Sequence, residues 1–206
     1  MLKELIYKNK TFRRFYENVE IPYQQMKQWI ELVRLIPNAR NQQALKYLII
    51  NDKNIKEQLF PTLKWAGYLK DWQGPEPGER PSAYIVIGID RRISDNYIAH
   101  WTYVDLGIAI QTLLLAAVEA GYGGCVIVAM NKPKQREILH LPEFFDIQAV
   151  LALGKPKENV IWKDMKPGDR DIRYYRDEKG NHYVPKRPLS EILLNEWEEF
   201  KFIKNH

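Results

Sequence analysis

The segment that decides the fold is residues 98–120, IAHWTYVDLGIAIQTLLLAAVEA, which is followed at once by the glycine-rich turn 121–125, GYGGC. From Leu106 onward the segment is apolar nearly all round, which is typical of a helix with protein on every side. Gly121 predicts the end of this helix, because glycine readily takes the left-handed conformation that closes helices. We therefore expect a long helix at the centre of the fold.

Shorter elements surround this helix on both sides in the sequence. Runs of apolar and β-branched residues predict strands at 45–50, 84–89, 125–130 and 148–153. Apolar residues at helical spacing predict helices at 2–8, at 22–36, at 55–70 with a break near Pro61, and at 134–140. The order lacks a regular alternation of strand and helix, so we predict an α+β fold in which helices flank a sheet.

The remaining segments are expected to be less regular. Residues 71–81 are rich in glycine and proline, which predicts a loop. After Pro156 the chain turns polar and irregular, and residues 189–202 form a tail with helical character. We expect one domain over 1–206, with residues 186–206 as a C-terminal arm.

The composition narrows the class of protein. The chain has 206 residues and is 45% hydrophobic, which is enough for one sizeable core. It carries a net charge of +5. Excess surface lysine and attraction for anionic ligands both explain the charge. Basic residues are interspersed with acidic ones rather than gathered in a stripe, so no nucleic-acid binding is expected.

The same composition bears on location. A single cysteine, Cys125, excludes an internal disulfide, and the N-terminal residues lack the apolar run of a signal peptide. The most apolar stretch, 106–118, is interrupted by Gln111 and Thr112 and is too short to span a bilayer. We expect a cytoplasmic protein that does not enter a membrane.

Several common active sites are absent from the sequence. No serine lies in a Gly-x-Ser-x-Gly turn, and the four histidines lack the spacing of metal ligands, so no metal is expected. The glycines of 121–124 follow a helix and precede a strand, whereas nucleotide-binding glycine loops run from strand to helix. Cys125 is expected to be a small buried residue rather than a nucleophile.

A basic cluster near the N-terminus is the first candidate site. Lys10, Arg13 and Arg14 lie within five residues and accompany Thr11. A solvated turn is one interpretation, and a phosphate site is the other, because guanidinium groups bind phosphate through paired hydrogen bonds.

Five segments taken in order resemble the nitroreductase family, which binds FMN. They are residues 9–15 (NKTFRRF), 37–43 (PNARNQQ), Asp105-Leu106-Gly107 with Gln111, 121–125 (GYGGC) and 186–189 (KRPL). The resemblance covers about residues 2–194. It implies a mostly antiparallel central sheet and an intertwined homodimer whose C-terminal extension lies on the partner.

The first segment is similar to the family's Arg-Arg-Ser-x-Arg motif. Lys10, Thr11 and Arg13 match its second, third and fifth positions, and Asn9 replaces the first arginine. The resemblance implies that these residues hold the FMN phosphate, with Arg13 at the N1 and O2 edge of the flavin. A cation at that edge stabilises the anionic reduced flavin and so raises its reduction potential. Asn9 either weakens the phosphate site or is compensated by Arg187.

The second segment is similar to the family's Pro-Ser-x-x-Asn-x-Gln loop, which contacts FMN bound mainly by the other subunit. Pro37, Asn41 and Gln43 match, Asn38 replaces the serine, and Ala39 follows it. A helix end and turn would explain Pro37 and Asn38 without a ligand. Arg40 either reaches the phosphate across the interface or is exposed to solvent.

The other three segments complete the implied flavin site. Asp105, Gly107 and Gln111 match the family's long helix, in which Gly107 permits close packing at the dimer interface. After the turn, the backbone at Val128 and Ala129 is expected to approach flavin N5. Lys186 and Arg187 are expected to return to the phosphate, with a solvated tail as the alternative.

An aromatic group is the candidate substrate pocket. Its members are Trp65, Tyr68 and Trp72, next to the loop 71–81, and two interpretations are open. They form a core stripe on the expected helix, or they wall the exposed face of the flavin and stack planar substrates. Tyr97, His100 and Trp101 are candidates for the same pocket.

The resemblance implies a function as well as a fold. It implies an FMN-dependent oxidoreductase that transfers hydride from NAD(P)H, through flavin N5, to a nitroaromatic or quinone-like acceptor in a ping-pong sequence, with no catalytic protein residue. The alternatives are a specialised flavoenzyme of the same fold, for reductive dehalogenation or flavin fragmentation, and a non-catalytic FMN-binding module.

Overall fold

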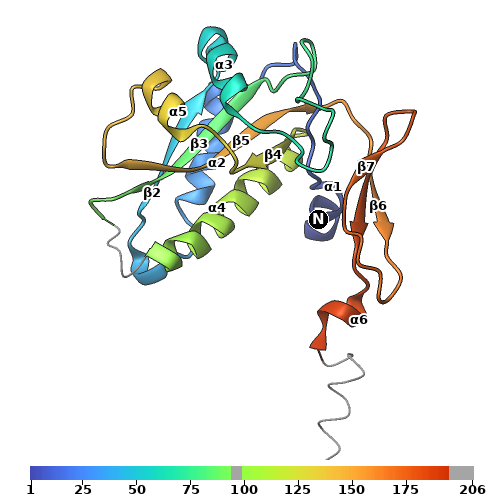
Figure 1. Cartoon of the computed structure of the whole chain (residues 1–206). Helices are drawn as coiled ribbons and strands as arrows, with labels where there is room; N and C mark the ends of the chain where they lie inside the picture. The colour runs from blue at the N-terminus through green and yellow to red at the C-terminus, as the bar shows by residue number, and fades with distance from the viewer. Residues whose placement is uncertain (94–98, 195–206) are drawn as a thin grey trace, which may run out of the picture. The chain divides into compact units, whose positions relative to one another are not determined.

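The computed structural model describes residues 1–93 and 99–194 of the chain. These residues form two compact units, one made of Met1–Ala66 with Trp72–Lys157 and the other of Gly67–Asp71 with the chain from Glu158 onward (Figure 1). The prediction of one domain over 1–206 stays a prediction, and each unit is described below by itself.

An antiparallel sheet forms the centre of the first unit. Its strands are β1 (Phe15–Tyr16), β2 (Leu45–Ile50), β3 (Ala83–Asp90), β4 (Gly123–Ile127) and β5 (Phe145–Pro156). They lie in the order β1-β5-β3-β2, and β4 also pairs with β5. Strand β5 is therefore bordered by β3 on one edge and by β4 and then β1 on the other.

Helices cover both faces of this sheet, as Figure 1 shows. They are α2 (Tyr23–Val33), α3 (Lys53–Leu59), α4 (Ala99–Glu119) and α5 (Lys132–Ile138), with short 3₁₀ turns η1 (Ala39–Asn41) and η2 (Phe60–Thr62). Helix α1 (Leu2–Lys8) contacts α4. Alternate residues of β3 point to opposite faces, so Ile85 and Ile87 pack against α2 and α4, while Tyr84 and Val86 pack on the side of α3. The predicted α+β fold is confirmed.

Helix α4 lies where the sequence predicted a long central helix. Leu106, Ala109, Leu113 and Ala117 are buried in the core that this helix shares with α2 and the sheet. Within the described residues, His100–Glu119 is the one helix long and apolar enough to cross a membrane. Core helices pass the same test, and the buried residues of α4 identify it as one.

The prediction of a helix through 55–70 was wrong beyond the break at Pro61. Helix α3 ends at Leu59, η2 occupies Phe60–Thr62, and no helix follows up to residue 70. Pro61 lacks the N–H that an α-helix needs, and Ala66 has a left-handed φ of 40° that a continuing helix cannot contain. The spacing of Trp65, Tyr68 and Trp72 is therefore not a helical stripe.

The second unit contains a small sheet in a region that was expected to be irregular. Strand β8 (His182–Lys186) pairs in parallel with β6 (Val160–Asp164) and antiparallel with β7 (Tyr175–Arg176). The helical tail predicted at 189–202 begins as α6 (Leu189–Ile192), and residues 195–202 lie outside the described part of the chain.

Candidate functional site

Four of the five motif segments meet in the first unit. The N–H of Phe12 donates to the carbonyl of Gly124 at 3.0 Å, beside a parallel bridge between Thr11 and Gly124. The N–H of Ala39 donates to Asp105 Oδ1 at 2.9 Å. The Asn9 side-chain amide also lies 3.5 Å from Gln111 Oε1. Segments that are distant in sequence are thus joined around the two ends of α4 and the start of β4.

The glycines of the turn explain why the first segment can lie against β4. A Cβ atom at Gly123 would lie 2.5 Å from the Phe12 ring, and one at Gly124 would lie 2.9 Å from the backbone oxygen of Ala152. The missing side chains let residues 11–12 approach the strand. In this segment Lys10 is half-buried, Thr11 is exposed and Arg13 is buried.

The loop 37–43 has an uncommon backbone. Arg40, Asn41 and Gln43 all have left-handed φ angles of 52° to 54°, although none of them is glycine. Such residues cost about 1–3 kcal/mol each and cluster at functional sites. The Asn38 amide donates to the Ile36 carbonyl at 2.8 Å, and the Gln43 amide donates to the Asn41 carbonyl at 3.3 Å. These bonds hold the loop in its strained form.

The loop's other predicted residues lie at its surface. Pro37 and Arg40 are exposed, and Ala39 is tied to α4 through Asp105. Asp105 itself is buried, and sequence reasoning assigned it no bond to the loop. The close spacing of Asp105 and Gly107 on an apolar helix was the only sign that a partner existed.

Strand β4 ends earlier than the strand through residue 130 that the sequence predicted. Strand β4 spans Gly123–Ile127, so Val128 and Ala129 lie just past its end, and the Val128 side chain is 65% exposed. The Ala129 carbonyl accepts from the N–H of Lys64 at 3.0 Å. This stretch of backbone is accessible at the surface of the first unit.

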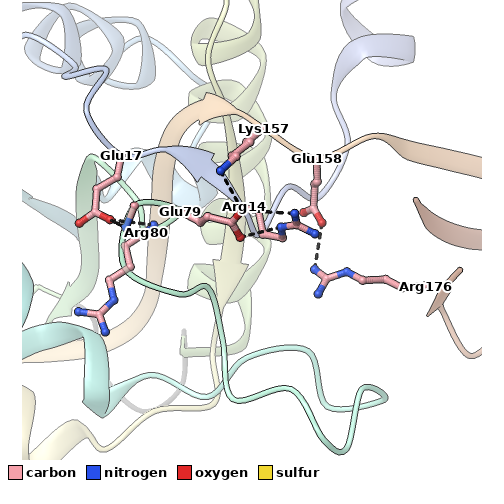
Figure 2. Close-up of polar contacts among 8 residues, drawn as sticks. Arg14, Glu17, Glu79, Arg80, Lys157, Glu158 and Arg176 are labelled. Carbon is pink, nitrogen blue, oxygen red and sulfur yellow. Dashed lines mark hydrogen bonds and ion pairs between the residues drawn. The ribbon is translucent and has the colours of Figure 1, made fainter. Parts of the chain in front are cut away.

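The glycine- and proline-rich loop 71–81 is anchored by Arg14 of the basic cluster and by Lys157, which the sequence did not single out. Arg14 Nε donates to Glu79 Oε2 at 2.8 Å, and Lys157 Nζ lies 3.0 Å from Glu79 Oε1 (Figure 2). Burial raises the pKa of Glu79, but the hydrogen bonds from Lys157 and Arg14 outweigh it and hold that pKa below its usual range. Arg14 therefore serves the loop as an anchor.

The predicted aromatic pocket is divided by the structure. Trp65 is buried in the core, with its ring 5.7 Å from that of Phe60 and directly beneath Gly74. Trp72 is half-buried in the same unit. Tyr68 belongs to the second unit, where its ring lies 4.9 Å from that of Tyr174. The core interpretation thus describes Trp65.

The remaining aromatic candidates lie at the start of α4. The rings of His100 and Trp101 are 4.7 Å apart, and Trp101 is half exposed. Tyr97 lies outside the described residues.

The C-terminal basic pair lies in the second unit. Lys186 ends β8, and Arg187 Nη1 donates to Glu191 Oε2 at 2.9 Å, one helical turn along the chain. Both side chains are exposed, and their expected return to a phosphate stays a prediction. In the part of the chain that the structure describes, no group of three or more His, Cys, Asp or Glu side chains is arranged to hold a metal.

Comparison with known proteins decides the family. A sequence model described as "Nitroreductase family" matches residues 6–155. The chain belongs to the nitroreductase family. This nitroreductase-family chain is 23% identical over 159 residues to the Archaeoglobus fulgidus protein named "Putative NADH dehydrogenase/NAD(P)H nitroreductase", covering 75% of the chain and 85% of that protein.

Solved structures share the fold of this nitroreductase-family chain. A nitroreductase family protein from Streptococcus pneumoniae superposes with a TM-score of 0.65 at 18% identity, over 94% of this chain and 98% of that one. A Staphylococcus epidermidis protein named "putative NAD(P)H:FMN oxidoreductase" gives 0.61 at 16% identity, over 77% and 88%. The predicted family and its fold are confirmed, and the family membership identifies an oxidoreductase.

Proposed function

We propose that the protein is an FMN-dependent oxidoreductase that uses NAD(P)H to reduce a small planar acceptor, nitroaromatic or quinone-like. The observation that supports this most strongly is that segments 9–13, 39–43, 105–111 and 123–124 are linked to one another in pairs along α4 in the first unit. The name of the Staphylococcus epidermidis relative, which shares the fold, points to the same cofactor.

The residues of these linked segments fit the chemistry of FMN. Lys10, Thr11 and Arg13 supply two cations and a hydroxyl within four residues, which suits a phosphate and the electron-rich edge of a flavin ring. The nearby carboxylate of Asp105 already accepts the N–H of Ala39, so it is not directed at an anion. Asn41 and Gln43 are exposed and add amide groups that can bond a flavin ring.

When bound, FMN would accept a hydride from NAD(P)H at N5 and pass the electrons to the acceptor. The chain's own contribution is to bind and orient. Arg13 would place a positive charge at the pyrimidine edge, where it favours the reduced flavin, and Lys10 and Thr11 would hold the phosphate. The backbone at Val128 and Ala129 would face N5, and Lys186 and Arg187 would complete the phosphate site.

An absorbance spectrum of the purified protein, before and after anaerobic NADH or NADPH, tests the proposal. We expect the bands of oxidised flavin, and we expect one nucleotide to bleach them. Flavin that does not bleach would contradict reductase activity and leave a binding protein. A colourless protein that fails to take up added FMN would overturn the cofactor itself.

The role of Arg13 is tested by its own variants. Arg13→Ala should lower the fraction of protein that holds FMN, and Arg13→Lys should retain part of it because the charge remains. Arg91→Ala is the matched control, since Arg91 lies on the surface of the same unit and pairs with Asp146, and neither residue is assigned to FMN. Full FMN occupancy in Arg13→Ala would contradict the assignment.

We further propose that the protein works as a cytoplasmic homodimer joined through α4. Trp101, Val104 and Ile108 recur at helical spacing on α4 and are 52%, 53% and 38% exposed, opposite the core residues of the helix. An apolar stripe of this kind suits a subunit interface. The single cysteine, which is buried and forms no disulfide, suits a reducing compartment.

Size-exclusion chromatography with light scattering tests this interface. Ile108→Glu should convert a dimer to a monomer, because it places a charge within the apolar stripe. Leu35→Glu is the control, since Leu35 is an exposed leucine beyond the end of α2. A dimer that survives Ile108→Glu would place the interface elsewhere.

A further inference from the structure

A second cavity lies in the first unit, lined by residues that no motif of the flavin site includes. The cavity has a volume of about 190 Å³ and is partly open to solvent. Its walls come from the chain after β1, from α3 and η2, and from the entry to β3. The lining residues are Glu17, Asn18, Glu20, Asn51, Lys53, Lys56, Glu57, Phe60, Arg80, Pro81 and Tyr84.

Arg80 is the first sign that the cavity accepts a ligand. Its own N–H bonds to the Glu17 carboxylate at 3.3 Å, yet its side chain points away from that carboxylate, as Figure 2 shows. The guanidinium carbon lies 4.2 Å from the centre of the Phe60 ring, and Nε is buried without a hydrogen-bond partner. No carboxylate among the described residues pairs with this guanidinium.

Tyr84 is the second and independent sign. It is 1% exposed, lines the cavity from β3, and its hydroxyl has no hydrogen-bond partner among the described residues. Its phenol lies within range of the charges of Arg80 and Glu17, which line the same cavity. Burial raises the pKa of Tyr84, so the hydroxyl keeps its proton and is available as a donor.

These two groups suit one kind of ligand. A guanidinium with a buried unpaired N–H and a neighbouring phenol are hydrogen-bond donors without acceptors, and a buried donor left unpaired costs about 1–3 kcal/mol. An anion of planar shape satisfies both, because a carboxylate accepts paired bonds from a guanidinium. The Phe60 ring and Pro81 add apolar wall beside them.

The charge of the rim limits the ligand further. Glu17, Glu20 and Glu57 offset the charges of Lys53, Lys56 and Arg80, so the cavity as a whole is not strongly positive. Lys56 is also engaged, because its Nζ donates to the Ser82 carbonyl at 2.8 Å. The three carboxylates would repel a dianion such as phosphate. A single negative charge is neutralised by Arg80 and requires no other cation of the rim.

We propose that this cavity binds a small organic monocarboxylate, whose carboxylate group accepts hydrogen bonds from the Arg80 guanidinium and the Tyr84 hydroxyl. The site is separate from the residues assigned to FMN. It stands or falls independently of the flavin function.

Calorimetric titration of the purified full-length protein with benzoate tests the proposal. Arg80→Gln should weaken benzoate binding by about tenfold or more, because it removes a charge-assisted hydrogen bond. Tyr84→Phe keeps the buried ring and removes only the hydroxyl, so it should weaken binding by a smaller factor. Arg34→Gln, which removes a surface arginine of the same unit, should leave binding unchanged.

Three results would overturn the proposal. The first is a protein that does not bind benzoate, and the second is binding of equal strength in wild type and Arg80→Gln. If benzoate shifts the visible flavin spectrum and still binds Arg80→Gln, it binds at the flavin, and this too is the second result. The third is inorganic phosphate that binds more tightly than benzoate, which would contradict the choice of a monocarboxylate.

Discussion

The two sheets of this protein are built from different interactions. In the central sheet of the first unit, all eight residues of β3 are buried, and Leu151 and Leu153 of β5 are fully enclosed. In the small sheet of the second unit, two of the twelve residues of β6, β7 and β8 are buried, and the others are partly buried or exposed. Apolar burial holds the first sheet together, and it contributes much less to the stability of the second.

Side-chain pairs take over this role in the second unit. The rings of Tyr175 and Tyr183 stack across β7 and β8 at 5.1 Å, and Arg176 Nη2 lies 3.0 Å from Glu158 Oε2. The carboxylate of Asp177 accepts from the N–H and the side-chain amide of Asn181, both at 2.8 Å, and so closes the turn between the strands. A sheet can therefore form without a sustained apolar pattern when an aromatic cross-strand pair and polar contacts beside the strands are well placed.

The largest expected effect tests the apolar sheet. Val150→Ala, at a fully buried position of β5, should lower the free energy of unfolding by about 2–4 kcal/mol, because it leaves a cavity in the core. Val184→Ala, in half-buried β8, is the matched truncation and should cost less than about 1.5 kcal/mol. Urea unfolding of both variants gives the two values. Equal losses would contradict the contrast between the sheets.

A smaller effect tests the polar sheet. Arg176→Met should destabilise the second unit by about 1–3 kcal/mol, since the Glu158 carboxylate that it pairs with is fully buried. Amide hydrogen exchange of β8 measures this local loss. Arg173→Met is the control. It should leave the protection of β8 unchanged, because Arg173 and its partner Asp171 are both largely exposed. Unchanged β8 protection in Arg176→Met would show that the ion pair is dispensable.

This contrast also explains what could be predicted from the sequence. Strand β2 and helix α4 were located within one residue, because long apolar runs leave few ways to be buried. The small sheet was missed, since ring pairs and ion pairs between distant residues leave no periodic signal. The helix predicted beyond Pro61 was wrong because the aromatic residues at 65, 68 and 72 fall at helical spacing by chance.

The candidate site divides in the same way. The basic cluster, the loop 37–43 and the turn 121–124 were recognisable as motifs, and the bond from Ala39 to Asp105 joins two of them. The anchoring of Glu79 by Arg14 and Lys157 was not predictable, because the three residues are far apart in the sequence and their types are common on surfaces. Arg80 and Tyr84 escaped notice because they belong to none of the motifs.

The finest test uses a pair of matching carboxylates, one in each unit. Asp90 and Asp171 each bind the arginine two residues later through its N–H at 3.1 Å and its guanidinium at 2.7 Å. The hydrogen bonds from Arg92 and Arg173 lower the pKa of each carboxyl group to about 2. The Asp90 side chain is fully buried, whereas that of Asp171 is 62% exposed.

A pKa below the usual value of about 3.9 means that the folded state favours the charged form. The stabilising contribution is therefore complete above about pH 4 and is lost as the pH falls towards 2. Asp90→Asn should be less stable than wild type at pH 5, and the gap should be clearly smaller at about pH 2.5. Asp171→Asn should follow wild type throughout, because solvent screens its ion pair. Urea unfolding midpoints at the two pH values measure both gaps, and a gap for Asp171→Asn as large as that for Asp90→Asn would show that burial does not set the difference.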